Sequence, residues 1–98
     1  MTLTRKLIRA DGTEFHLEGP HAMDDILTMI GADTLDVVRL RHMGNPVHTM
    51  LVDDDGHLKD LPINQKATTL YHANCKPGTT WPIRGDVVIV PDSDFAEI

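Results

Sequence analysis

The sequence predicts an α+β fold, a single small domain in which two short helices pack on a mixed, mainly antiparallel sheet of about five or six strands. A chain of 98 residues suits one hydrophobic core. Runs of β-type residues next to Asp-Gly turns predict strands, and two other stretches carry apolar residues at helical spacing. We expect residues 1–91 to form this domain and residues 92–98 to be an acidic C-terminal tail that either docks or projects.

The N-terminal part predicts a hairpin followed by a helix. Asp11-Gly12 tolerates the positive φ angles of a tight turn, so we expect strands near residues 3–9 and 14–18. In residues 21–32 the apolar side chains fall at i, i+3, i+4 and i+7, which is one stripe of a helix. The members of this stripe are Met23, Ile26, Leu27 and Ile30.

The middle of the chain predicts sheet. Residues 34–41 and 47–54 are rich in β-branched and other apolar residues, which favours strands. Asp55-Gly56 offers a second hairpin turn, so we expect a further strand at residues 57–62.

Residues 61–71, LPINQKATTLY, predict the start of the second helix. Asn64 is a strong N-cap, because its side-chain oxygen can accept a free N–H of the first turn. Pro62 discourages the preceding strand from continuing. The apolar face of this helix, at i, i+3 and i+4, consists of Ala67, Leu70 and Tyr71.

The region after this helix predicts a central strand. Pro77-Gly78 should end the helix. Val87 to Val90 are four consecutive β-branched residues, a run that is apolar on both faces. Such a run indicates a strand that is covered on both sides or lies at the centre of the sheet.

Charge and hydropathy exclude several classes of protein. Nine Lys and Arg residues against fifteen Asp and Glu residues give a net charge of −6, which argues against binding to nucleic acid or anionic membranes. No stretch resembles a membrane span, and the first residues lack the apolar core of a signal peptide. We therefore expect a cytoplasmic protein, either monomeric or a small homo-oligomer, whose charged partners would be basic.

One acidic run invites a calcium-binding interpretation, which its spacing does not support. Asp53 to Asp55 precede Gly56, as acids do in an EF-hand loop. That loop would also need acids where Leu51 and Pro62 stand, so a solvated turn is the favoured interpretation.

His72 and Cys75 are three residues apart near the end of the second helix. They could hold a metal or act as a thiol nucleophile and its base. A structural cysteine is the favoured interpretation, because free Cys behaves as a small apolar residue. Cys75 is the single cysteine, which excludes an intrachain disulfide and suits a reducing compartment. We expect no metal and no cofactor.

Basic residues on two predicted strands raise the question of a phosphate site. If these strands are neighbours, their side chains could form one patch for a nucleotide; otherwise they are ordinary charges on a solvent face. No Gly-rich phosphate loop supports the sharper interpretation. The fifteen carboxylates could also imitate DNA phosphates, although an ordinary acidic surface is favoured. The basic residues on these strands are Arg5, Lys6, Arg9, Arg39 and Arg41.

A pattern of short motifs covers residues 51–90. It consists of an acidic-Gly turn, Leu-Pro-x-Asn, a helix with Ala-Thr-x-Leu-Tyr and a closing Gly-Asp-Val-Val strand. The residues that form it are Gly56, Leu61, Pro62, Asn64, Ala67, Thr68, Leu70, Tyr71, Gly85, Asp86, Val87 and Val88.

This pattern resembles the C-terminal half of a family of small uncharacterised proteins of actinobacteria, their phages and mobile elements. The first half of the chain resembles the family only in general layout. The resemblance implies a phage or mobile-element origin and carries over no catalytic residue. It also favours action by binding, for example by occupying a host or defence protein or by holding a signalling nucleotide.

The expected function is therefore that of a non-enzymatic phage or mobile-element accessory protein that binds a host macromolecule, above all a protein. The alternative is a small-ligand binder that sequesters a nucleotide or another phosphorylated signal, and an enzyme ranks third. The candidate binding residues are Gln65, Lys66, Thr69, Tyr71, His72, Arg39 and Arg41.

Overall fold

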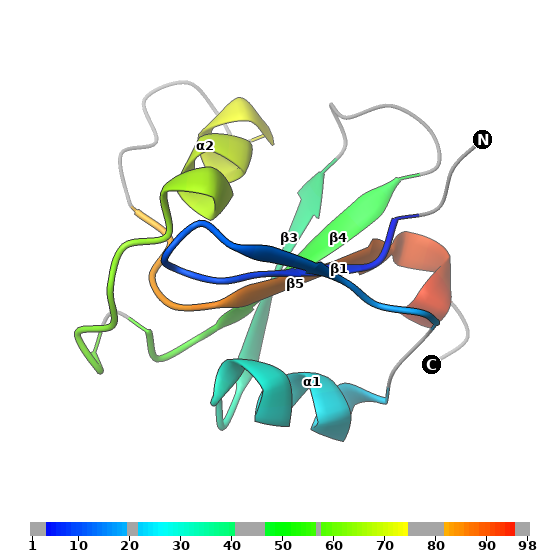
Figure 1. Ribbon diagram of the computed structural model, residues 1–98, viewed down its shortest axis with the longest axis horizontal. Helices are drawn as coiled ribbons and strands as arrows, with labels where there is room; N and C mark the ends of the chain where they lie inside the picture. Colours follow the sequence, from blue (N-terminus) through cyan, green and yellow to red (C-terminus); the bar gives the residue numbers. More distant parts are fainter. Residues whose placement is uncertain (1–3, 20–21, 41–46, 57, 75–81, 96–98) are drawn as a thin grey trace.

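Five antiparallel strands form one sheet with a helix on each face, as the computed structural model shows (Figure 1). It describes residues 4–19, 22–40, 47–56, 58–74 and 82–95. The predicted α+β architecture is confirmed. In chain order the elements are β1 (Lys6–Ile8), β2 (Glu14–His16), α1 (Met23–Ile30), β3 (Leu35–Leu40), β4 (His48–Asp53), α2 (Gln65–Asn74), β5 (Val87–Pro91) and the 3-10 helix η2 (Asp92–Phe95).

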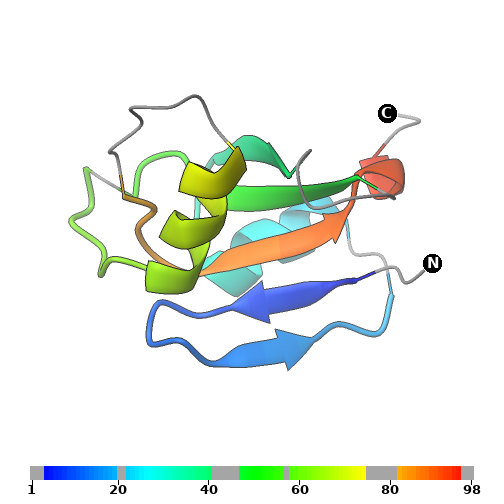
Figure 2. The ribbon, with the colours of Figure 1, turned by 90° about the horizontal axis from the view of Figure 1, so that it is seen from above.

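The strand order is β2-β1-β5-β4-β3, which places β5 at the centre of the sheet. Figure 2 shows the β1–β2 hairpin at one edge and β3 at the other. Val87 and Ile89 belong to the apolar cluster under α2, while Val88 and Val90 belong to the cluster over α1. Consecutive side chains of a strand point to opposite faces, so this apolar run is buried from both sides. The predicted central strand is confirmed.

The first helix covers one face of the sheet with the C-terminal part of its apolar stripe. Ile26 and Ile30 are buried and belong to the same cluster as Leu51 and Val88. Met23, at the beginning of the stripe, is exposed. The helix ends at Gly31, whose left-handed φ of 66° is a conformation that costs glycine little.

The second helix covers the opposite face through the apolar side predicted for it. Ala67 is fully buried, and Leu70 and Tyr71 are partly buried against the same cluster. The cluster also contains Met50 of β4 and Val38 of the edge strand β3, so α2 packs on side chains from the edge as well as the middle of the sheet.

The predicted strand at residues 57–62 is wrong. Among the described residues of this segment, 58–60 form turns. The Asp53 carboxylate accepts the N–H of Asp55 at 2.8 Å and binds Lys59 Nζ at 2.9 Å. Side-chain bonds of this kind offer the backbone an alternative to a strand ladder, so the turn continues instead of opening into a hairpin.

The beginning of the acidic tail docks on the sheet. Thr49 Oγ1 donates to the Asp92 carboxylate at 2.8 Å, and the Arg5 guanidinium binds both oxygens of Asp94 at 2.7 and 2.9 Å. A bidentate Arg–carboxylate pair fixes orientation as well as distance. η2 is therefore part of the fold, while the last three residues lie outside the described residues.

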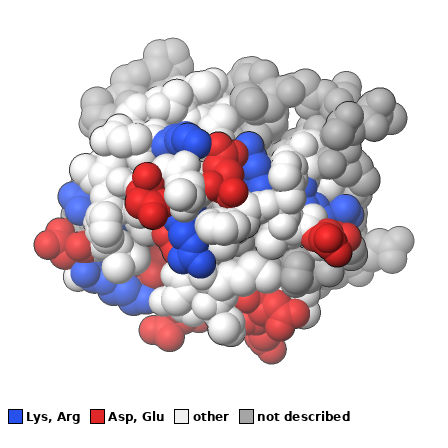
Figure 3. Space-filling view, in the orientation of Figure 1, with Lys and Arg blue, Asp and Glu red and all other residues white. Residues whose placement is uncertain are grey.

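The described basic side chains form ion pairs within the molecule. Of the nine Lys and Arg residues, Arg41 and Lys76 lie outside the described residues, and each of the other seven pairs with a carboxylate. Figure 3 accordingly shows basic and acidic side chains beside each other, with further acidic ones along the edge where α1 lies. The pairs are Arg5–Asp94, Lys6–Glu14, Arg9–Asp86, Arg39–Asp92, Lys59–Asp53, Lys66–Glu14 and Arg84–Asp60.

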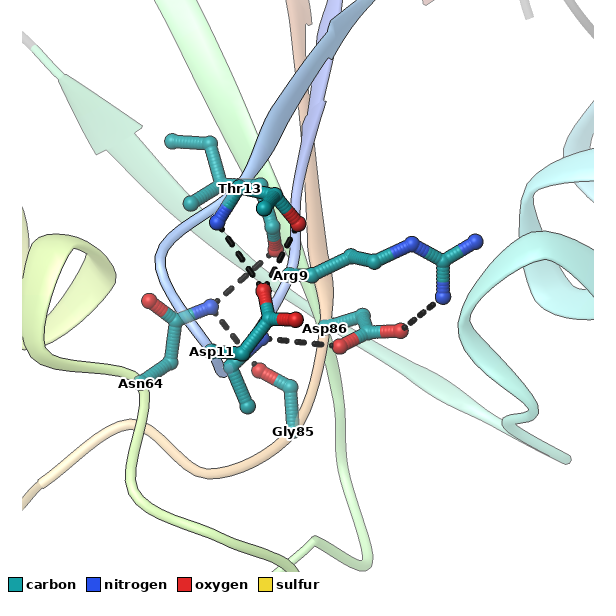
Figure 4. Close-up of polar contacts among 8 residues, drawn as sticks. Arg9, Asp11, Thr13, Asn64, Gly85 and Asp86 are labelled. Atoms are coloured by element: carbon teal, nitrogen blue, oxygen red, sulfur yellow. Dashed lines mark hydrogen bonds and ion pairs between the residues drawn. The ribbon is translucent and has the colours of Figure 1, made fainter.

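The buried side chain of Asn64 joins α2 to the sheet (Figure 4). Its Oδ1 accepts the N–H of Ala67 at 3.0 Å, which confirms the predicted N-cap. Its Nδ2 donates to the carbonyl oxygens of Ile8 at 3.1 Å and Gly85 at 3.0 Å. One amide group therefore caps α2 and satisfies two carbonyl groups that are otherwise far apart in the chain.

Gly85 and Asp86 complete this junction (Figure 4). Gly85 has a φ of 85°, and a Cβ there would lie 2.8 Å from Leu61 Cδ1, so any larger residue would be strained as well as crowded. The Asp86 carboxylate accepts the N–H of Ala10 at 2.9 Å and a bond from Arg9 at 3.2 Å. The Gly-Asp motif thus attaches the start of β5 to the β1–β2 hairpin.

Asn64→Ala should lower the free energy of unfolding by about 3 kcal/mol, because it removes a helix cap and leaves two buried carbonyl groups without their donor. Asn64→Ser keeps a capping oxygen and should lose less. Urea unfolding checks both, with the exposed neighbour Gln65→Ala as the control, expected within about 0.5 kcal/mol of wild type. A loss below about 1 kcal/mol for Asn64→Ala would contradict the assigned role.

Candidate functional site

A hollow of about 310 Å³ lies between α2 and the β1–β2 hairpin, and we call it the hairpin hollow. Lys6 and Ile8 lie two residues apart on β1, and Glu14 pairs with Ile8 across the hairpin. All three therefore share the face that α2 covers. The lining residues are Lys6, Ile8, Glu14, Lys66, Thr69 and Leu70.

Glu14 is held between two lysines at this hollow. Its carboxylate lies 2.8 Å from Lys6 Nζ and 2.6 Å from Lys66 Nζ. Hydrogen bonds from Lys6 and then Lys66 lower the pKa of Glu14 to about 2. The carboxylate already occupies the position between two ammonium groups where the phosphate of a ligand would bind.

The structure divides the candidate residues of the second helix between two places. Lys66 and Thr69 line the hairpin hollow, and Gln65 is exposed beside them at the start of α2. Tyr71 lies at a second hollow, and the exposed His72 stacks at an angle against it, with ring centroids 5.7 Å apart. No single surface therefore contains the whole predicted set.

The two basic strands are not neighbours, so the prediction of one basic patch is wrong. β5 and β4 lie between β1 and β3. Arg39 also lies on the sheet face opposite α2, because its neighbours Val38 and Leu40 belong to the cluster under that helix. Its Nε is 3.7 Å from Asp92, and Arg41 lies outside the described residues.

The second hollow has a volume of about 170 Å³ and lies where α2 meets β3 and β4, so we call it the edge hollow. Two exposed residues, Asp36 and Asp54, provide carboxylates to its lining, and α2 provides the side chain of Tyr71. Arg84 is the basic residue among its described lining residues. Its guanidinium donates hydrogen bonds to the Asp60 carboxylate and to the carbonyl oxygen of Leu61. The lining residues are Asp36, Val38, Val52, Asp53, Asp54, Gly56, Tyr71, Pro82, Ile83 and Arg84.

The edge hollow borders the outer edge of β3. Asp36 is on the hollow side of this strand, and the next residue, Val37, points to the other face with half of its surface exposed. The Val37 N–H donates to the Asp36 carboxylate at 2.9 Å. A backbone donor of an edge strand is thus bound to a side chain of its own strand.

Carboxylates gather where α1 leads into β3 and β4 ends. Asp33, Asp36, Asp54 and Asp55 have no ion-pair partner among the residues that the structure describes. We call these four residues the acidic corner. Two of them act on Lys59, whose pKa is raised by Asp53 first and by Asp33 and Asp55 in addition.

The binding residues predicted from the sequence did not include Asp36, Val37 or Asp54. Adjacent Val37 and Val38 were nevertheless a usable signal, because consecutive strand residues face opposite sides and one valine of the pair must leave the α2 cluster. Val37 is buried only if α1 extends far enough across the other face of the sheet to cover it. The pattern of residues in one strand does not indicate how far that helix extends.

The described residues contain no group of three or more His, Cys, Asp or Glu side chains placed to hold a metal ion. Asp53, which the calcium interpretation invoked, instead binds Lys59. The proposed pair of His72 and Cys75 remains a prediction, since Cys75 lies outside the described part of the chain. Neither α1 nor α2, the α-helices of the described residues, combines the length and the apolar character that a membrane-spanning helix needs.

Comparison with known proteins gives no relative: no family model, no curated protein and no solved structure matches the chain. The site must therefore be interpreted from its own geometry.

Glu14→Gln should lower stability modestly at neutral pH and lose this effect in acid. The pKa of Glu14 is about 2 in the folded protein against an ordinary 4.5, so its ion pairs contribute fully above pH 4.5 and disappear as the pH falls towards 2. Thermal unfolding of wild type and variant should show midpoints that converge over this range.

Glu18→Gln is the matched control, because this carboxylate has no ion-pair partner within the described residues. It should show no comparable dependence on pH. A gap between Glu14→Gln and wild type that stays constant down to about pH 2 would contradict the two-lysine arrangement.

Proposed function

We propose that this chain is a non-enzymatic accessory protein of a phage or mobile element and that it binds a host protein. The motif pattern at residues 51–90 supports the origin by its resemblance to small proteins of such elements. The position of these motifs limits what the resemblance can contribute. Asn64, Gly85 and Asp86 serve the junction of α2, β1 and β5, so they favour a shared fold and leave the binding surface to other residues.

The distribution of unpaired charge is the observation that favours a protein partner. All seven described Lys and Arg side chains are in ion pairs, whereas the acidic corner lies beside exposed apolar groups. Val37 is 50% exposed, and Leu58, in the turn after β4, is 84% exposed. Apolar side chains bordered by carboxylates suit a protein surface that carries basic and apolar groups.

A nucleotide or another phosphorylated signal is the second candidate, and the hairpin hollow favours it. Its volume of about 310 Å³ and its two lysines provide space and charge for a small anion. However, both lysines bind Glu14, and a phosphate would have to displace that carboxylate. The free energy of breaking two ion pairs therefore opposes binding at this site.

Affinity capture from an actinobacterial lysate, followed by binding measurements on the purified captured protein, tests the proposal. Asp36→Lys with Asp54→Lys should reduce affinity at least about tenfold, because the acidic corner would repel a basic partner. Asp24→Lys with Asp25→Lys makes the same charge change on α1 and should leave affinity within about threefold. Equal affinity of both double variants would argue against the acidic corner as the binding surface.

Thermal unfolding with a panel of mononucleotides and cyclic dinucleotides separates the two candidates. The protein-binding proposal expects a change in Tm below about 1 °C with every nucleotide. A rise of several degrees, abolished by Lys66→Ala and accompanied by no captured protein, would replace the proposal with the nucleotide alternative.

A further inference from the structure

The hydrogen-bond register shows which backbone groups of β3 face outwards. The Asp54 N–H donates to the Thr34 carbonyl at 3.1 Å, so these two opposite residues form a hydrogen-bonded pair of the ladder. In an antiparallel ladder such pairs alternate with pairs that are not bonded. The N–H and C=O groups of Leu35, Val37 and Arg39 therefore point away from β4. The bond from the Val37 N–H to the Asp36 carboxylate agrees with this direction.

The outer edge of β3 is better suited to pairing than the outer edge of β2. β3 has six residues, which span about 20 Å, whereas β2 has three. On β2 the Phe15 ring lies under the Arg9 guanidinium at 5.4 Å, and the Glu14 carboxylate is held by two lysines. Side chains that bind each other in this way are not free to contact an added strand.

The side chains beside this edge specify what an added strand should carry. Val37 presents a half-exposed apolar side chain on the α1 face of the sheet. Asp36 lies on the α2 face at the edge hollow, together with Asp54 and Tyr71. An added strand alternates between the same two faces, so an apolar residue beside Val37 would be followed by a residue that faces the carboxylates.

Asp36 would contribute twice to such pairing. Its carboxylate now satisfies the outward Val37 N–H, which protects the edge of the unbound protein. A carbonyl oxygen of an added strand can accept the same N–H and release the carboxylate. The released carboxylate is then available to a basic side chain on the α2 face, where a charge-assisted bond replaces the local one.

We propose that the protein partner adds an extended segment with alternating basic and apolar residues to the outer edge of β3, an inference that rests on the proposed function. The basic residues face Asp36 and the edge hollow, and the apolar residues cover Val37. A second copy of the chain is a poorer occupant, because each copy carries a net charge of −6 and would bring its own acidic corner to the same edge.

A labelled synthetic peptide of about seven alternating lysine and valine residues, long enough to pair with all of β3, serves as the probe. Fluorescence anisotropy should show binding to the full chain that weakens with added salt. A peptide of the same composition with its lysines in one block should bind at least about tenfold more weakly, because it cannot match the two faces. Equal binding of the two peptides would overturn the inference.

Val37→Pro removes an outward N–H without removing a bond to β4, and it should weaken peptide binding at least about tenfold. His16→Pro is the matched control on the other edge. Its N–H also points outwards, since the adjacent pair Arg5 and Leu17 is hydrogen-bonded, and its affinity should stay within about twofold of wild type. Circular dichroism and unfolding midpoints establish that each variant is folded. Unchanged affinity of a folded Val37→Pro would contradict edge pairing.

Amide chemical shifts of the wild-type protein give a readout that needs no variant. The peptide should change the amide chemical shifts of residues 35–39 and protect their amide hydrogens from exchange. Sedimentation should show one copy of the chain per complex. Chemical-shift changes at the hairpin hollow instead, or dimerisation through β3, would overturn the inference.

Binding of a captured host protein separates this inference from the proposed function. If that protein binds wild type and Val37→Pro equally, edge pairing is wrong and the proposed function stands. If no protein binds the chain, the proposed function itself is wrong.

Discussion

The amide of Asn64 is the interaction on which the arrangement of the molecule depends. Three segments that are distant in the chain, the end of β1, the start of α2 and the turn before β5, meet at its three hydrogen bonds. A buried amide group is costly unless its hydrogen bonds are made, so the side chain stabilises this junction and disfavours alternatives. The position of α2, and with it both hollows, follows from this junction.

The same junction explains why a motif can look functional and still describe a fold. LPINQKATTLY contains many polar groups, yet Asn64 is buried at the cap and Ala67 lies in the core. Lys66 is the residue of this stretch with a distant charged partner, Glu14. A motif made of a helix cap, a buried small residue and a turn glycine determines the backbone conformation and says little about which ligand binds. Each of these residues acts through its cap hydrogen bond, its volume or its φ angle.

Local signals in the sequence predicted most of the elements, and long-range contacts decided the rest. Val87 to Val90 indicated a doubly covered strand, and Asn64 indicated a helix start, because neighbouring residues contain that information. The strand order is different in kind: it separates Arg5 from Arg39 by two strands, and no local pattern specifies it. The strand predicted at residues 57–62 was wrong for a related reason. The turn there depends on the bond between Asp53 and Lys59, which the pattern of apolar residues does not contain.

Charge pairing links the fold to the proposed function. Arg5 and Arg9 pair with carboxylates of distant segments, and Lys6 pairs with Glu14 of the neighbouring strand. An external phosphate would have to break these ion pairs to bind the same side chains. Fifteen acidic residues exceed what nine basic residues can neutralise, and four of the unpaired carboxylates, those of the acidic corner, lie near the edge strand β3. Like charges near an edge oppose pairing between two copies of the chain. In the proposed complex the same charges would attract a basic segment, so one arrangement would both limit self-association and favour a basic partner.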